Sequence, residues 1–286
     1  VILGGGPAGN TAATVAATLG ADVTVIEREI VGGAAHLRDC IPSKAMIATG
    51  GALAELTRAQ VMGLSAEGRL DLHALCLRVA SIENRLHASV CNLLESQGVR
   101  IIRGTGVLKG PHTVMAETEH GMEEVDADFV VLATGSRPRI PDFVHVDGER
   151  ILTTRQAYPP PEVPDHLVVI GSGVTGVEFT HMFSAFGSKV TLVVSRQQVL
   201  PYKDAEVAAV LEDAFLQRGV KLLKGARAEI VERDGDSVRV ECDDGRVVVA
   251  SHVVLAVGSI PNSESLGLDD AGVEVDLGLG DMEEAP

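Results

Sequence analysis

The sequence predicts an α/β protein in which one order of elements occurs twice, once in each of two three-layer units. Apolar stretches typical of strands lead directly into glycine-rich turns at residues 4–9 and 171–176. Each turn opens a helix of small and apolar residues, and each helix leads to a second strand, at residues 22–27 and 189–194. We therefore expect two βαβ units, each with a parallel sheet.

Length and composition agree with two domains. The chain has 286 residues, of which 45% are hydrophobic, and a domain has roughly 100–200 residues. The formal net charge of −16 argues against nucleic acid as a partner, because binding phosphates requires a basic surface. No apolar run reaches the roughly 18 residues that predict a membrane-spanning helix. We expect a cytoplasmic protein with small-molecule ligands. The cysteines lack metal-ligand spacing, so no metal site is predicted.

Both turns have the G-x-G-x-x-G spacing of a dinucleotide-binding motif. The first glycine permits the tight turn, the second lets a pyrophosphate approach the backbone, and the third lets the helix pack close to the strand. The helix N-terminus then faces the anion. The motif predicts two Rossmann-like dinucleotide-binding domains. The glycines concerned are Gly4, Gly6 and Gly9 in the first copy and Gly171, Gly173 and Gly176 in the second.

Each copy closes with a predicted β-meander and a strand that ends in another glycine. Gly4 to Gly135 spans 131 positions and Gly171 to Gly258 spans 87, so the first copy is 44 residues longer. The additional residues include a predicted helix with one apolar face, which we expect to face the core. The residues of that face are Leu72, Leu75, Val79, Ile82, Leu86, Val90 and Leu93.

The residue that ends the second strand indicates which nucleotide each copy binds. Glu27 ends this strand in the first copy, and an acidic side chain there accepts hydrogen bonds from a ribose hydroxyl, which suits the adenosine of FAD. Val194 stands at the same offset in the second copy and is followed by Ser195 and Arg196, which favour the 2′-phosphate of NADPH over NADH. The alternative is that Arg196 is simply solvated and the site accepts both cofactors.

A further motif lies at residues 32–44 and resembles the redox segment of the flavin disulfide reductases. In that pattern, Gly-Gly-x-Cys-x-x-x-x-Cys-x-Pro-Ser-Lys, two thiols shuttle electrons between a flavin and an external substrate. Here Ala35 occupies the first thiol position and Cys40 the second. Because Cys40 has no partner at that spacing, a flavin served by this chain needs another electron outlet.

Over essentially its whole length the chain resembles the pyridine nucleotide disulfide oxidoreductases, the family of lipoamide dehydrogenase and glutathione reductase. Both glycine motifs, the Cys-x-Pro-Ser-Lys segment and the paired endings at residues 133–138 and 256–262 occur in the family's order. Within the family, Gly-Gly-Ala-Ala followed by Asp-Cys-Ile-Pro-Ser-Lys most resembles an actinobacterial branch of NAD(P)H quinone reductases that lacks the first redox cysteine.

The resemblance implies two sets of cofactor contacts. For FAD they are Gly4, Gly6, Gly9, Glu27, Lys44, the backbone near Gly106, Thr134 and Gly135. For NADPH or NADH they are Gly171, Gly173, Gly176, Glu178, Ser195, Arg196 and Gly258. The resemblance also implies that Lys44 and Glu178 pair beside the flavin as catalytic groups, and that Cys40, expected at the start of the helix opened by Pro42, lies against it. Cys40 then either keeps a packing or flavin-tuning role or takes part in redox chemistry.

Three functions follow from this resemblance. In the first, hydride passes from NAD(P)H to FAD and electrons then pass to a quinone-type acceptor. In the second, the protein is a dihydrolipoamide dehydrogenase-like thiol/disulfide oxidoreductase that uses Cys40 with another thiol. In the third, it is a non-catalytic flavin-binding redox sensor.

The predicted domains are an FAD-binding domain at residues 1–150 and an NAD(P)H-binding domain at 151–262. Residues 263–286 are expected to begin a return into the FAD domain. The sequence is interpreted as an N-terminal fragment, since family members continue into a C-terminal interface domain through which they form homodimers.

Overall fold

The computed structural model of the chain describes residues 1–65 and 67–275. The chain forms two compact units from interleaved segments. Of the described residues, the first unit comprises 1–40, 81–137 and 260–275, and the second comprises 41–65, 67–80 and 138–259. Paired strands β8 (Ser136–Pro138) and β17 (Ser259–Pro261) lie where the chain passes between units. The expected return segment lies partly outside the described residues, from residue 276 onward.

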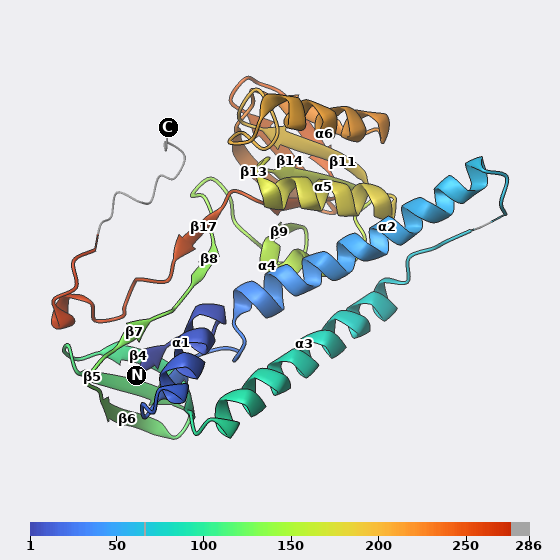
Figure 1. Cartoon of the computed structure of the whole chain (residues 1–286). Helices are drawn as coiled ribbons and strands as arrows, with labels where there is room; N and C mark the ends of the chain where they lie inside the picture. The colour runs from blue at the N-terminus through green and yellow to red at the C-terminus, as the bar shows by residue number, and fades with distance from the viewer. Residues whose placement is uncertain (66, 276–286) are drawn as a thin grey trace. The chain divides into compact units, whose positions relative to one another are not determined.

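A parallel four-stranded sheet forms the centre of the first unit (Figure 1). Helix α1 (Pro7–Thr18) connects its first two strands, and the C-terminal half of α3 (Leu72–Ser96) leads into the third. In spatial order the strands are β3 (Arg100–Arg103), β2 (Thr24–Glu27), β1 (Ile2–Leu3) and β7 (Val131–Leu132).

An antiparallel meander follows the sheet of the first unit. Its strands are β4 (Thr105–Leu108), β5 (Thr113–Thr118) and β6 (Gly121–Asp126). One face of the meander buries Leu108, Val114 and Ala116 against Leu3 and Ile26 of the parallel sheet. Alternate residues of β4 and β5 are therefore buried, as expected for strands with one face against a core.

The second unit repeats this plan with one more parallel strand. Helix α5 (Val174–Phe186) connects its first two strands, and α6 (Ala205–Gln217) leads to the third. The spatial order is β12 (Lys221–Lys224), β11 (Lys189–Val194), β10 (His166–Ile170), β16 (His252–Leu255) and β9 (Ile151–Thr153). Its meander consists of β13 (Ala228–Asp234), β14 (Ser237–Cys242) and β15 (Val247–Ala250).

Helix α2 (Ile41–Val61) packs against α5 within the second unit. Met46 of α2 is buried beside Met182 and Phe183 of α5, while Phe179 stacks on Tyr158 with ring centroids 4.4 Å apart. The short helix α4 (Thr154–Ala157) begins at a capping box on Thr153. Aromatic and thioether side chains thus fill the layer above the sheet.

The architecture confirms the predicted fold class, since each unit has a parallel sheet in the order third, second, first and fourth strand. The predicted helical stripe is correct except at its end. On α3, Leu75 and Val79 are buried, but Leu93 is 49% exposed and Leu94 is 1% exposed. Leu94 lies four residues after Val90, so it continues the face that packs against β2.

The redox segment contains a turn that the sequence did not reveal. Residues Ala35–Cys40 form a π-helix, labelled η1, which continues directly into α2. Cys40 lies directly before α2, whose first turn contains Pro42, as expected, but helical backbone also precedes it in η1. π-Turns insert residues into helices and are frequent at functional sites.

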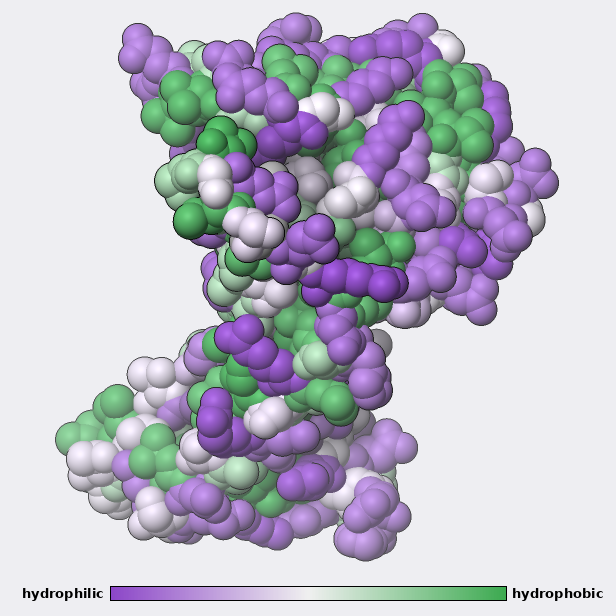
Figure 2. All heavy atoms as spheres, turned by 90° about the vertical axis from the view of Figure 1, so that its right-hand side faces the viewer, coloured by the Kyte–Doolittle hydropathy of each residue, from purple (hydrophilic) through white to green (hydrophobic). Residues whose placement is uncertain are grey.

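The surface mixes polar and apolar side chains, as Figure 2 shows for one face. Among the described residues, no helix combines the length and the apolar character that crossing a membrane requires. One further short element, the 3₁₀ turn η2, spans Asp269–Ala271.

Candidate functional site

The first glycine turn brings β1, α1 and the strand after the meander into close contact. Gly4 has φ +105°, and a Cβ there would lie 2.2 Å from the carbonyl oxygen of Ala133. A Cβ on Gly9 would lie 1.9 Å from the carbonyl oxygen of Gly4. Both positions therefore require glycine, the first for its backbone conformation and the second for the close helix–strand packing.

The second glycine turn repeats these contacts nearly to the tenth of an ångström. Gly171 has φ +107°, and its Cβ would lie 2.3 Å from the oxygen of Ala256. A Cβ on Gly176 would lie 1.8 Å from the oxygen of Gly171. A Cβ on Gly173, in contrast, would meet no described atom within 4 Å, which leaves open space at the start of α5.

Glu27 lies at the carboxyl end of β2, against the first glycine turn. Its carboxylate accepts hydrogen bonds from the backbone N–H groups of Gly5 and Glu29, each at 2.6 Å, and of Ile30 at 3.2 Å. Three amide donors fix the direction of this side chain. The remaining acceptor capacity of a carboxylate is available to a ligand hydroxyl.

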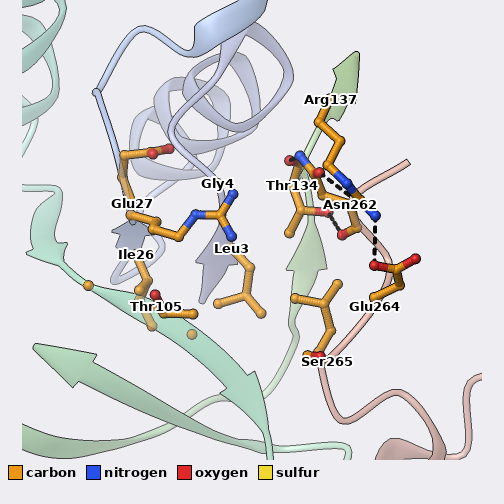
Figure 3. Close-up of a pocket in the computed structure, with 14 residues that line it drawn as sticks. Leu3, Gly4, Ile26, Glu27, Thr105, Thr134, Arg137, Asn262, Glu264 and Ser265 are labelled. Atoms are coloured by element: carbon orange, nitrogen blue, oxygen red, sulfur yellow. Dashed lines mark hydrogen bonds and ion pairs between the residues drawn. The ribbon is translucent and has the colours of Figure 1, made fainter. Parts of the chain in front are cut away.

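Next to Glu27 the first unit contains a cavity of about 330 Å³ (Figure 3). In the figure, Leu3, Gly4, Ile26 and Glu27 lie on one side of it, and the segment after β7 lies opposite. A Cβ on Gly106 would lie 2.5 Å from the side chain of Leu3, so glycine at this position lets β4 approach Leu3 closely. The lining residues are Leu3, Gly4, Ile26, Glu27, Arg28, Gly104, Thr105, Gly106, Thr134, Arg137, Asn262, Glu264, Ser265 and Leu266.

The side of the cavity opposite Glu27 is held by polar side chains (Figure 3). The Thr134 hydroxyl donates to the carbonyl oxygen of Asn262, and the Asn262 amide donates back to the carbonyl oxygen of Thr134, both at 2.8 Å. Arg137 donates to the side chains of Asn262 at 3.2 Å and Glu264 at 2.7 Å. These bonds join residues about 125 positions apart into one wall of the cavity.

These features fit the adenosine diphosphate portion of FAD. Helix α1 begins at Pro7, and among the described residues no side chain caps its N-terminus at Gly6. An uncapped helix N-terminus offers amide donors to a pyrophosphate. Glu27 supplies the acceptor expected for a ribose hydroxyl, and the cavity is lined by Glu27 and by Gly4, the first residue of the turn.

The second glycine turn offers amide donors but a different set of side chains. Helix α5 begins after Gly173, and no described side chain caps that end either. Val194, at the position corresponding to Glu27, is fully buried, whereas Ser195 and Arg196 are exposed. The backbone carbonyl of Arg196 accepts a hydrogen bond from Gly225 N–H at 3.0 Å, which fixes the start of this loop beside the end of β12. The arrangement fits a nucleotide whose ribose carries a negative group.

Lys44 and Glu178 form the ion pair that the resemblance implied. Lys44 Nζ lies 2.6 Å from Glu178 Oε1, and their side chains are 59% and 23% exposed. Lys44 is on α2 and Glu178 is on α5, so the packing of these two helices creates the pair. An ammonium beside a carboxylate can hold or neutralise charge on a group placed next to it.

The redox segment contains one thiol. Ala35 and Cys40 occupy the ends of the π-turn η1, and both are exposed. The other cysteines are Cys76, Cys91 and Cys242, and none of the four forms a disulfide in the structure. Among the described residues, no cluster of three or more His, Cys, Asp or Glu side chains could hold a metal ion.

The structure gathers one part of the predicted FAD set around the cavity. Gly4, Glu27, Gly106 and Thr134 line it. Gly6, Gly9 and Gly135 instead shape the backbone near it, and Lys44 and Cys40 do not line it.

Sequence reasoning missed Asn262, Glu264, Arg137 and Arg28 as lining residues. The Pro261-Asn262 ending was visible in the sequence. Only the fold reveals that this ending bonds to Thr134.

Comparison with known proteins agrees with this geometry. The chain matches the family model described as pyridine nucleotide-disulphide oxidoreductase over residues 1–280. An NAD(P)H dehydrogenase (quinone) of Mycobacterium tuberculosis is 44% identical over 97% of this chain and 59% of the relative. A dihydrolipoyl dehydrogenase of Zymomonas mobilis is 36% identical over 98% of this chain and 61% of the relative.

Solved structures give the same result. The crystal structure of LpdA from Mycobacterium tuberculosis has a TM-score of 0.89 and 44% identity, covering 96% of this chain and 61% of that one. The flavoprotein disulfide reductase RclA from Escherichia coli, at 24% identity and a TM-score of 0.85, shares the fold. The chain spans about 60% of the length of these relatives. The chain belongs to the pyridine nucleotide-disulphide oxidoreductase family, whose members use FAD and NAD(P)H.

Proposed function

We propose that the protein is an FAD-dependent oxidoreductase that takes hydride from NAD(P)H and delivers electrons to a quinone-type acceptor. One observation carries this proposal: the redox segment has Ala35 where the disulfide reductases have a thiol, so residues 32–44 contain one cysteine and cannot form the internal disulfide of those enzymes. The relative with 44% identity is named an NAD(P)H dehydrogenase (quinone), which supports the same acceptor class.

In this proposal the residues of the chain bind and orient FAD and the pyridine nucleotide. The first glycine turn and Glu27 hold FAD, with Thr134 on the opposite side of the cavity and Gly135 next to it in the chain. The second turn holds the pyridine nucleotide, and Ser195 with Arg196 favours the phosphate of NADPH, while NADH remains the alternative. Bound FAD supplies the capacity to accept two electrons and a proton as hydride and to pass them on.

Lys44 and Glu178 are proposed to stabilise negative charge on the flavin ring. The resemblance to the family implies a position for this pair beside the flavin. With FAD bound there, the Lys44 ammonium would stabilise negative charge on the ring, and Glu178 would keep the ammonium oriented and neutralised where water is excluded. Cys40 is proposed to tune this environment without carrying electrons. The homodimer and the cytoplasmic location stay predictions.

The acceptor profile of the intact, FAD-loaded protein tests the proposal. In stopped-flow measurements, NADPH should reduce the flavin and benzoquinone-type acceptors should reoxidise it. Cys40→Ser should leave both steps nearly unchanged. If quinones fail to reoxidise the flavin, the proposed acceptor class is wrong. If Cys40→Ser abolishes acceptor reduction while flavin reduction survives, a thiol mechanism replaces it.

Ala35→Cys provides the matched gain-of-function control. In a π-helix, residues five apart are joined by one backbone hydrogen bond, so a thiol at residue 35 faces Cys40 across one turn. The variant has five cysteines, and a disulfide between residues 35 and 40 uses two of them. Thiol titration of the oxidised protein after unfolding should therefore find three thiols in the variant and four in the wild type. A disulfide and new dihydrolipoamide oxidation are expected together.

A further inference from the structure

A histidine outside the nucleotide motifs contacts the backbone of the segment that precedes the redox turn. His87 lies on α3, and its Nδ1 is 2.8 Å from the carbonyl oxygen of Val31. Val31 is buried and follows the end of β2 by four residues. This bond therefore ties a long helix to the loop that leads from Glu27 into Gly32 and Gly33.

The chemistry of the bond fixes the role of each atom. A carbonyl oxygen only accepts, so Nδ1 must carry a hydrogen and donate it. The neutral Nδ1–H tautomer and the imidazolium both satisfy this requirement. The bond is partly buried, so water is a poor substitute for the Nδ1–H donor. Loss of this donor would leave the Val31 carbonyl oxygen without a hydrogen bond from His87.

The segment held by His87 lies directly on the first glycine turn. Gly32 N–H donates to the Gly5 carbonyl at 2.8 Å, and Gly33 N–H donates to Ile30 at 2.9 Å. Gly33 approaches Gly6 so closely that a Cβ on Gly33 would lie 2.3 Å from the Gly6 Cα. A shift of Val31 therefore displaces Gly5 and Gly6, which form the backbone of the pyrophosphate turn.

Cys91 touches the same imidazole but does not make a nucleophilic pair with it. Its Sγ lies 3.8 Å from both ring nitrogens, one helical turn from His87. Burial raises the pKa of the Cys91 thiol, which keeps it in the neutral form. A neutral thiol at this distance packs against the ring and holds it in place. A positioning role for His87 thus fits better than a thiolate–imidazolium site.

We propose that His87 is a positioning residue for FAD, because its bond to Val31 holds the Gly32-Gly33 segment against the glycine turn that receives the diphosphate. The inference rests on the proposed function, since it assigns the ligand of that turn as FAD. His87 does not touch the flavin in this proposal. It acts through Val31, Gly32 and Gly5.

Two substitutions separate the hydrogen bond from the bulk of the ring. His87→Phe keeps an aromatic ring and removes the donor. His87→Asn places an amide N–H near the position of Nδ1 and can restore the bond. His73→Phe is the matched control, because His73 is an exposed histidine on the same helix.

The primary measurement is FAD affinity of the intact protein after removal of the flavin, followed by flavin fluorescence during reconstitution. We expect the Kd of His87→Phe to rise about fivefold, as loss of one hydrogen bond implies, and that of His87→Asn and His73→Phe to stay near the wild type. Hydrogen exchange at the Gly32 amide gives a readout without ligand. It should be faster in His87→Phe and near normal in His87→Asn.

Wild-type affinity and exchange in His87→Phe would overturn the inference, as would equal losses in the Phe and Asn variants. If the wild-type protein itself binds no FAD, the proposed function fails. Exchange at Gly32 in the flavin-free protein then still decides whether His87 holds this segment.

Discussion

The two glycine turns of this protein have the same backbone and differ in the residues that come after the second strand. Gly4 and Gly171 have nearly equal φ angles, and the third glycines approach the first ones to nearly equal distances. In both copies the returning chain donates a backbone hydrogen bond of 2.8 Å to the second residue of the turn, from Gly32 to Gly5 and from Leu200 to Ser172.

The difference lies at the ends of β2 and β11. Glu27 is aimed at the first turn by three backbone amides, while Val194 is buried in the core and leaves the second site to Ser195 and Arg196. In the proposed function, this shared backbone receives a diphosphate in both copies. We expect the residues that end or follow the second strand to select which nucleotide binds.

The largest expected effect on stability comes from replacing the third glycine of each turn, which lets the helix pack closely against the strand. Gly9→Ala and Gly176→Ala place a methyl group on a carbonyl oxygen, and each should lower the free energy of unfolding of its unit by about 3 kcal/mol or more. If the copies are independent, Gly9→Ala should impair FAD binding and Gly176→Ala should impair NADPH binding. Urea unfolding and ligand titration measure both effects.

Gly51→Ala is the control for this pair. Gly51 lies within α2, and a Cβ there meets no described atom within 4 Å. Alanine is the better helix former, so stability should rise by up to about 1 kcal/mol. Equal losses in Gly51→Ala and Gly176→Ala would show that the close approach at the turn is not the cause.

A smaller effect is expected at the residue that distinguishes the copies. Glu27→Gln removes a charged acceptor, and hydrogen bonds to charged groups contribute about 1.5–3 kcal/mol, so FAD affinity should fall about tenfold or more. Glu29→Gln is the matched control, because the Glu29 side chain is exposed and pairs with Arg28 at the surface. Unchanged FAD affinity in Glu27→Gln would remove Glu27 from the ribose site.

The corresponding test in the second copy concerns cofactor preference. Arg196→Ala should reduce the ratio of kcat/KM for NADPH to that for NADH about tenfold, because one ionic hydrogen bond to the 2′-phosphate is lost. Lys189→Ala, at the opposite end of β11, should leave the ratio unchanged. If Arg196→Ala changes neither value, the site accepts both nucleotides without using this arginine.

The smallest effect concerns acid stability of the second unit. Burial, followed by the nearby Arg150 guanidinium, lowers the pKa of His252 below its ordinary value of 6.5. The unfolded chain therefore binds a proton at higher pH than the folded one, so stability is fully present above pH 6.5 and falls as pH falls below it.

Urea unfolding of the wild type and His252→Gln between about pH 7.5 and pH 5 measures this difference. The variant should lose less stability on acidification than the wild type. Burial also lowers the pKa of His166 and His181 in the same unit, so some acid sensitivity should remain in the variant. Equal acid sensitivity of both proteins would exclude His252 as a contributor.

Much of the fold was predictable because local signals carried it. The strand–turn–helix order, both glycine motifs and the additional helix before β3 are visible as spacing and periodicity in the sequence. The predicted end of the apolar face of α3 was wrong, because Leu94 is buried there and Leu93 is exposed. Which of the two is buried depends on the surface that the last turn of the helix packs against. The π-turn was missed because a single inserted backbone residue leaves no periodic signal.

The sequence by itself determined the duplicated plan, the acidic residue at the end of β2, its absence at the end of β11 and the missing thiol at Ala35. Only the tertiary structure decided that Asn262 bonds to Thr134 from 128 residues away, and that His87 holds Val31. It also brings Lys44 to Glu178, 134 residues apart, a pairing that the family resemblance had implied. The physical reason is that local spacing fixes which element a residue belongs to, whereas contacts between distant residues depend on how whole helices and sheets pack.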